Sequence, residues 1–142
     1  YDKKLLNTFS TVAKNLEMEH VMVVHGDDGL DEISISGPTQ ISEYKNYKIE
    51  EYTISPQEFG ITTSPFEEIS AQSSEQSLRM VQEAFSGEQS AVQDMIALNA
   101  GAGLYIARKV DSISDGVELA FTLMNNGKAA DKLAAYVRVS NS

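Results

Sequence analysis

The sequence predicts an α/β fold, in which part of a mostly parallel sheet and an antiparallel hairpin pack against a helical C-terminal half. Three observations support this class. A short apolar run that ends in an acidic, glycine-containing turn is typical of a buried strand. Two strand-like segments around a polar turn predict a hairpin. Helical periodicity then dominates the sequence from about residue 74 onward.

The composition restricts the kinds of protein that this chain can be. Its 142 residues are 42% hydrophobic and 23% charged, which is ordinary for one soluble globular domain. No apolar stretch approaches the roughly 20 residues of a membrane span. The absence of cysteine excludes disulfides and thiolate chemistry, and it is compatible with the cytoplasmic location that we expect.

The net charge of −10 argues against a nucleic-acid partner, because phosphate backbones are bound by clustered Lys and Arg side chains. The basic residues here are scattered along the chain. The acidity also repels anionic ligands at long range. A phosphate group bound by this chain would therefore have to be met by a metal ion or by groups supplied from elsewhere.

The first half of the chain predicts a helix followed by strands. Apolar residues at helical spacing predict a helix from Asp2 to about Leu16, with Asp2 as its N-cap. Because this pattern begins directly after Tyr1, it suggests that the chain is cut from a longer one. Residues 20–25 form the predicted buried strand. Residues 33–36 alternate between apolar and polar, which predicts a further strand.

The next segments predict a hairpin with strands at 39–44 and 47–54, followed by one capped helical turn at 55–60. Residues 61–74 carry few periodic signals, and we expect a loop there. The remaining sequence predicts four helices with ends marked by Ser, Gly and Asn, at about 74–86, 89–108, 114–124 and 128–139.

Two glycines interrupt the second of these helices, in the segment Asn99–Gly103. Glycine inside a helix costs about 1 kcal/mol relative to Ala. The segment therefore predicts that another backbone packs closely against the helix. A phosphate-binding loop is the weaker interpretation, since no strand precedes the segment and no Lys-Ser or Lys-Thr follows it.

The segment His25–Glu32 carries the strongest functional signal. Four carboxylates lie in the turn that follows the predicted buried strand: Asp27, Asp28, Asp31 and Glu32. Carboxylates this close repel one another unless a cation lies among them, although a solvated turn is an equally simple interpretation. The spacing does not fit a calcium EF-hand, whereas a magnesium ion with a diphosphate ligand suits the loop.

The two histidines flank the predicted strand. His25 at its end could be a ligand, a donor to phosphate, or simply a strand-end residue, and His20 at its start is interpreted as a connector.

The whole segment resembles a motif of the anthranilate phosphoribosyltransferases, a phosphoribosyltransferase family related to nucleoside phosphorylases. The motif reads His-Gly-x-Asp-Gly-Leu-Asp-Glu and aligns here without a gap. The resemblance extends through the chain, over 33–39, 52–56, 59–60, 98–105, 116–120 and 127–129.

The resemblance implies a reaction and a metal site. In this family, the amine of anthranilate displaces pyrophosphate from 5-phosphoribosyl 1-pyrophosphate, a step of tryptophan biosynthesis. The Asp-Glu pair of the motif, here Asp31 and Glu32, is expected to hold Mg²⁺. Asp27 and Asp28 are expected to support these ligands or to remain solvated. The glycines Gly26 and Gly29 are expected to allow a close backbone approach.

The resemblance also implies what the chain lacks. Residues 71–77 contain neither the Gly-Gly nor the Asn-Ala that the family usually carries there. The family's Gly-Thr-Gly-Gly-Asp loop, its Lys-His-Gly-Asn segment and its N-terminal helical domain have no counterpart in residues 1–142. We therefore expect a single partial domain that is inactive alone, while the full-length protein forms a homodimer through the helical domain. A split subunit or a non-catalytic binding module of the same superfamily is the alternative.

Overall fold

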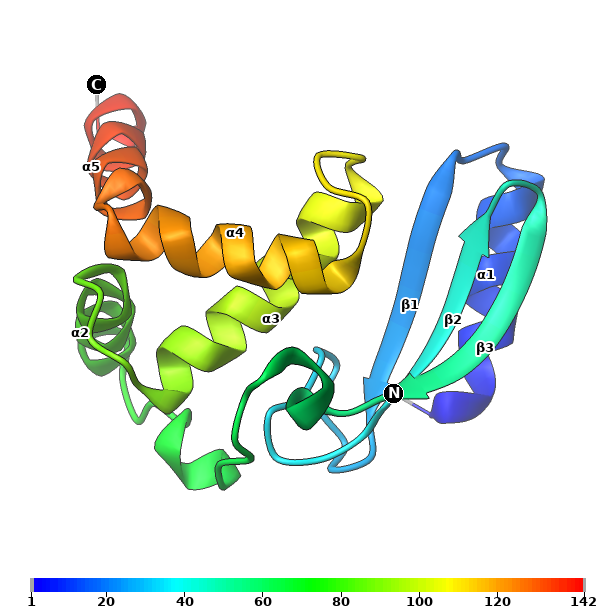
Figure 1. The fold of residues 1–142 in the computed structure, drawn as a ribbon, viewed down its shortest axis with the longest axis horizontal. Coiled ribbons are helices and arrows are strands. Elements are labelled where there is room, and N and C mark those ends of the chain that lie inside the picture. Colours follow the sequence, from blue (N-terminus) through cyan, green and yellow to red (C-terminus); the bar gives the residue numbers. More distant parts are fainter. Residues whose placement is uncertain (1, 142) are drawn as a thin grey trace.

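The computed structural model describes residues 2–141, which form a three-layered α/β structure (Figure 1). Helix α1 covers one face of a three-stranded sheet, and α3 and α4 lie on the other side. The α-helices and strands are α1 (Leu6–Asn15), β1 (His20–Gly26), β2 (Thr39–Lys45), β3 (Lys48–Ile54), α2 (Ser74–Phe85), α3 (Ala91–Ile106), α4 (Ile113–Asn125) and α5 (Lys128–Ser140).

The sheet is antiparallel throughout, with the strand order β1-β2-β3. The α/β class is thus confirmed, but the expectation of a mostly parallel sheet is wrong. A parallel pair needs a long crossover connection, usually a helix. The chain between β1 and β2 forms no helix and returns directly, so that Gly26 pairs with Thr39 and His20 with Lys45.

The hairpin predicted for residues 39–54 is confirmed. Lys45 pairs with Lys48, so the turn consists of Asn46 and Tyr47, one residue later than the sequence suggests. Both turn residues have positive φ angles, 51° and 65°. Such a turn matches the right-handed twist of the two strands, which offsets the strain at a residue other than glycine.

The strand predicted at residues 33–36 is absent from the described chain, although its apolar residues are buried. Ile33 and Ile35 are 2% and 0% exposed within an irregular segment. Side-chain oxygens satisfy the backbone here instead of a neighbouring strand: Ser34 N donates to Thr39 Oγ1 at 3.0 Å, and Ser36 N donates to Ser34 Oγ at 2.9 Å. The alternation of apolar and polar residues at 33–36 therefore indicates buried side chains, but not a strand.

The first helix begins as a 3₁₀ turn at Lys3–Leu5 and continues as α1. Asp2 caps it as predicted, since its carboxylate accepts a hydrogen bond from Lys4 N at 2.9 Å. Tyr1, at which the sequence suggests a cut, lies outside the described residues. On the buried side of α1, the Ser10 hydroxyl donates to the Ser42 carbonyl of β2 at 2.9 Å.

The main core lies between the sheet and helices α3 and α4. Its buried members are Ile33, Ile35, Ile41, Ile54, Ile61, Ala97, Leu98, Ala102, Val117, Ala120 and Met124. At the centre of the helix pair, Gly101 and Gly116 face each other. A Cβ atom on Gly101 would lie 2.6 Å from Val117 N. The packing interpretation of the glycine-containing helix is thus confirmed for Gly101, while Gly103 faces open space.

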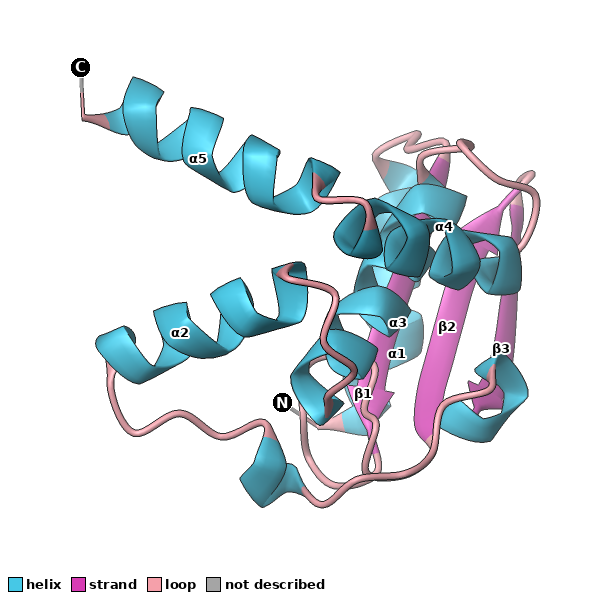
Figure 2. Ribbon diagram, turned by 60° about the vertical axis from the view of Figure 1, so that its left-hand side comes forward, coloured by secondary structure: helices cyan, strands magenta, loops and turns pink. Residues whose placement is uncertain are grey.

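Helices α2 and α5 extend on the same side, away from the sheet (Figure 2). The predicted loop at 61–74 is irregular apart from a short 3₁₀ turn at Phe66–Glu68. Within residues 2–141, none of the helices has both the length and the apolar character that crossing a bilayer would require.

Candidate functional site

The acidic loop, defined as residues 27–38, connects the end of β1 to the start of β2 at one end of the sheet (Figure 1). Backbone hydrogen bonds close its first turn: Gly26 N donates to the Leu30 carbonyl and Gly29 N donates to the Gly26 carbonyl, each at 2.9 Å. Gly29 has a φ of 95°, which strongly favours glycine. The loop is therefore a folded turn with a defined shape.

Asp28 organises this turn. Its carboxylate accepts hydrogen bonds from Leu30 N at 3.1 Å and from the Ser34 hydroxyl at 2.5 Å. A Cβ atom on Gly26 would lie 2.5 Å from Asp28 Oδ1, so the missing side chain lets the carboxylate reach its partners. Asp27 is exposed and accepts a longer bond of 3.3 Å from Gln40 Nε2. These two carboxylates support the loop.

Asp31 and Glu32 differ from this pair. Both are exposed, and within residues 2–141 neither carboxylate takes part in a hydrogen bond or an ion pair. Asp31 lies at the rim of an open hollow of about 550 Å³ that is otherwise apolar, lined by Leu5, Phe9, Met22, Val23 and Val24. The structure therefore presents exposed carboxylates on two consecutive residues, neither of which is used to hold the loop.

The two carboxylates fit part of a magnesium site. Magnesium is usually held in proteins by one or two carboxylates, with substrate phosphates and water as the other ligands. In the part of the chain that the structure describes, no three His, Cys, Asp or Glu side chains converge as a set that could hold a metal. Asp31 and Glu32 alone therefore do not complete a metal site.

Sequence reasoning missed Asn99, which lies 66 positions after Ile33. Its side chain accepts a hydrogen bond from Ile33 N and donates one to the Ile33 carbonyl, both at 2.9 Å. Ile33 directly follows Glu32. The signal in the sequence is a single amide within an otherwise apolar helical segment, which by itself indicates only helix packing.

His20 and His25 occupy the two ends of β1. His25 is half-buried and pairs with Gln40 of β2, as expected of a strand-end residue. The interpretation of His20 as a simple connector is wrong. His20 is 7% exposed, and its Nε2 lies 2.7 Å from Glu43 Oε1. His20 is buried, although it lies at a strand end, because Tyr105 of α3 packs against its ring.

Glu43 is the centre of a second polar cluster, at the end of the sheet opposite the acidic loop. It also accepts hydrogen bonds from the hydroxyls of Tyr52 at 2.7 Å and Tyr105 at 2.9 Å. Burial raises the pKa of Glu43, but the bonds from Tyr52, His20 and Tyr105 outweigh it and lower the pKa below its ordinary value. Burial and the bond to Glu43 raise the pKa of Tyr52.

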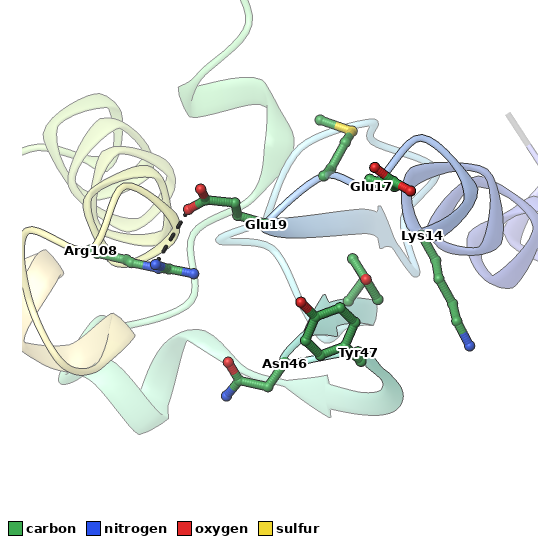
Figure 3. A pocket seen from close by; sticks show the side chains of 8 residues that line it. Lys14, Glu17, Glu19, Asn46, Tyr47 and Arg108 are labelled. Atoms are coloured by element: carbon green, nitrogen blue, oxygen red, sulfur yellow. Dashed lines mark ion pairs between the residues drawn. The ribbon is translucent and has the colours of Figure 1, made fainter.

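A hollow of about 730 Å³ lies beside this cluster, between the ends of α1 and α3 and the β2–β3 turn (Figure 3). Both acidic and basic side chains line it, namely Lys14, Glu17, Glu19 and Arg108. Arg108 Nη1 lies 3.3 Å from Glu19 Oε2, but both side chains are more than half exposed, and such pairs contribute little. The hollow is separated from the acidic loop by the length of β1, so it is not part of that site.

The sequence profile of the glycosyl transferase family, a/b domain, matches residues 1–130. The chain therefore belongs to this family. Its relatives include the anthranilate phosphoribosyltransferase of Halorhodospira halophila, which is 42% identical over 137 residues. The enzyme of the same name from Vesicomyosocius okutanii is 39% identical over 140 residues. These alignments cover 96% and 99% of this chain, but the chain spans only 40% and 41% of those relatives.

Solved structures show the same relationship. The crystal structure of anthranilate phosphoribosyltransferase from Thermus thermophilus superposes with a TM-score of 0.90 at 28% identity, over 100% of this chain and 42% of that one. The Saccharomyces cerevisiae enzyme in complex with PRPP and Mg has a TM-score of 0.87 at 20% identity, with the same coverage. At that identity the yeast structure shows a shared fold.

Proposed function

We propose that this chain is the C-terminal portion of the α/β domain of an anthranilate phosphoribosyltransferase. In the complete protein, it would contribute to the transfer of the phosphoribosyl group from 5-phosphoribosyl 1-pyrophosphate to the amine of anthranilate, with release of pyrophosphate. Membership of the glycosyl transferase family and the names of the relatives support this proposal.

The geometry of the acidic loop carries the proposal. Asp28 is engaged in holding the turn, whereas the consecutive residues Asp31 and Glu32 are left exposed. We assign these two residues to Mg²⁺, the ion named with the yeast enzyme of the same fold. A bound Mg²⁺ would neutralise negative charge on the pyrophosphate leaving group. The role of the chain is to fix two of its ligands at the end of β1.

Two carboxylates are only a part of such a site. The proposal therefore includes the prediction that the 142-residue chain is inactive on its own, since the diphosphate-binding loop of the family has no counterpart in its sequence. A homodimer formed through the family's N-terminal helical domain and a cytoplasmic location also stay predictions.

A hybrid protein tests the proposal. The chain would replace the matching 137 residues of the Halorhodospira halophila transferase. The assay follows the loss of anthranilate fluorescence with 5-phosphoribosyl 1-pyrophosphate and Mg²⁺. We expect turnover by the hybrid and none by the isolated chain. A folded but inactive hybrid would contradict the proposed transferase function and favour a non-catalytic binding module. Turnover by the isolated chain would contradict the prediction that the chain is inactive on its own. Turnover by the chain mixed with the separate remainder would indicate a split subunit.

A further inference from the structure

We infer that Asn99 is a positioning residue for Asp31 and Glu32, which it holds in place through the backbone of Ile33. The inference rests on the proposed role of the two carboxylates as magnesium ligands. Asn99 would not touch the metal or the substrate. It would act by fixing the chain directly after the ligands, so that both carboxylates stay at one position.

The contact between Asn99 and Ile33 is bidentate. Asn99 Oδ1 accepts from Ile33 N at 2.9 Å, and Asn99 Nδ2 donates to the Ile33 carbonyl at 2.9 Å. A primary amide offers an acceptor and a donor side by side, which matches the two polar groups of one backbone residue. Asn99 thus gives Ile33 the pair of bonds that a neighbouring strand would give it.

The amide itself is held by its own helix. Asn99 Nδ2 also donates to the Met95 carbonyl, one turn earlier in α3, at 3.0 Å. Two positions after Asn99, Gly101 packs against the backbone of Gly116 and Val117 in α4, with no room for a side chain. The anchor therefore belongs to a tightly packed helix pair, and a shift of Asn99 would require a shift of that pair.

Ile33 is a suitable point of attachment. Its side chain is 2% exposed in the core, whereas the preceding Glu32 and Asp31 are exposed and have no side-chain bonds of their own within residues 2–141. The position of the two carboxylates consequently depends on how firmly the adjoining backbone is fixed. Asp28 fixes the loop on the other side, through Leu30.

Two substitutions separate positioning from packing. Asn99→Ala removes both bonds to Ile33. Asn99→Asp keeps the shape and the acceptor for Ile33 N, but it replaces the donor Nδ2 by a carboxylate oxygen that faces the carbonyls of Ile33 and Met95. Gln93→Ala is the matched control, because Gln93 lies in the same helix and its Nε2 donates to Ala84 O and Asn125 Oδ1, both at 3.0 Å. The control removes two bonds away from the acidic loop.

The experiment uses NMR on the 142-residue chain and its variants, at a temperature at which circular dichroism shows all of them folded. Mn²⁺ serves as a paramagnetic substitute for Mg²⁺, and pyrophosphate is added to supply the phosphate ligand. Broadening of the Asp31 and Glu32 amide signals then gives the metal affinity at these two residues. An Asp31→Asn, Glu32→Gln double variant corrects for binding elsewhere on the acidic surface. Hydrogen exchange of the Ile33 amide reports the bond to Asn99.

We expect both Asn99 variants to weaken Mn²⁺ binding at the pair about tenfold, the lower end of the effects known for residues that orient metal ligands. Exchange of the Ile33 amide should accelerate in Asn99→Ala, and Gln93→Ala should change neither readout. Unchanged Mn²⁺ affinity in both Asn99 variants, or an equal loss in Gln93→Ala, would overturn the inference. If the unsubstituted chain showed no specific broadening at Asp31 and Glu32, their proposed metal role would fail, and the inference would fall with it. Accelerated Ile33 exchange with unchanged metal affinity would instead overturn the inference alone.

Discussion

The four carboxylates of the acidic loop have two different structural roles. Asp28 binds Leu30 N and the Ser34 hydroxyl, and Asp27 accepts a bond from Gln40. Asp31 and Glu32 remain exposed without such partners in residues 2–141. At the residue scale, a carboxylate that satisfies backbone donors is a structural group. The exposed carboxylates of Asp31 and Glu32 have no such role in the loop.

The Glu43 cluster makes the stability of the chain depend on pH. The folded pKa of Glu43 lies below its unfolded value near 4.5, so its contribution is fully present above the unfolded value and is lost as the pH falls through the folded one. We predict that the free energy of unfolding, measured with urea between about pH 7 and pH 3, decreases as the pH drops below about 4.5. Glu43→Gln should reduce this fall.

The same substitution should also lower stability at neutral pH, by about 1–3 kcal/mol, because it weakens the bonds to the buried His20 and the half-buried Tyr52 and Tyr105. The exposed Glu50→Gln is the control, and it should leave both the stability and its pH profile nearly unchanged. Identical pH profiles for Glu43→Gln and the unsubstituted chain would contradict the assignment.

At the scale of elements, helices α3 and α4 pack with their backbones in close approach at Gly101 and Gly116. A Cβ atom on Gly101 would lie 2.6 Å from Val117 N, whereas one on Gly103 would meet nothing within 4 Å. We predict opposite effects of the same change. Gly101→Ala should lower the free energy of unfolding by about 1–3 kcal/mol through overpacking. Gly103→Ala should raise it by about 0.5–1 kcal/mol, because alanine favours the helix. Chemical denaturation measures both, and equal effects would contradict the packing.

Local signals predicted most elements well. Asp2 caps the first helix as predicted, because capping depends on contacts within a few residues. Three later helices begin behind Ser73, Ser90 and Ser112, within two residues of the predicted starts. The sheet direction and residues 33–36 were predicted wrongly for the opposite reason. The alternation of Ile33 and Ile35 reports burial, and burial alone does not say whether a strand or a side chain such as Thr39 takes the backbone bonds.

The site shows the same limit. The motif around Asp31 and Glu32 lies within one loop, so it can be recognised from consecutive residues. The roles of Asn99 and His20 could not be predicted from the sequence. Their partners Ile33 and Glu43 are distant along the chain and are brought close only by tertiary packing.

At the scale of the whole molecule, the two edges of the sheet differ. The edge strand β3 carries charged residues such as Lys48 and Glu50, which discourage pairing with another chain, whereas β1 is apolar from Val21 to Val24. We predict that the isolated chain self-associates through β1. Val23→Lys should shift sedimentation toward the monomer. Thr53→Lys on β3 is the control and should leave association unchanged. A monomeric chain at high concentration would contradict this prediction.

The magnesium dependence of the hybrid transferase tests the central claim most directly. Turnover would be measured against Mg²⁺ concentration for the hybrid and for its Asp31→Asn, Glu32→Gln and Asp27→Asn variants. Loss of a direct ligand should reduce Mg²⁺-dependent turnover by at least about 10–100-fold and raise the Mg²⁺ concentration required. Asp27→Asn should stay close to the unsubstituted hybrid. If Asp31→Asn and Glu32→Gln retained full turnover at low Mg²⁺, the two carboxylates would not be metal ligands, and the account would be contradicted.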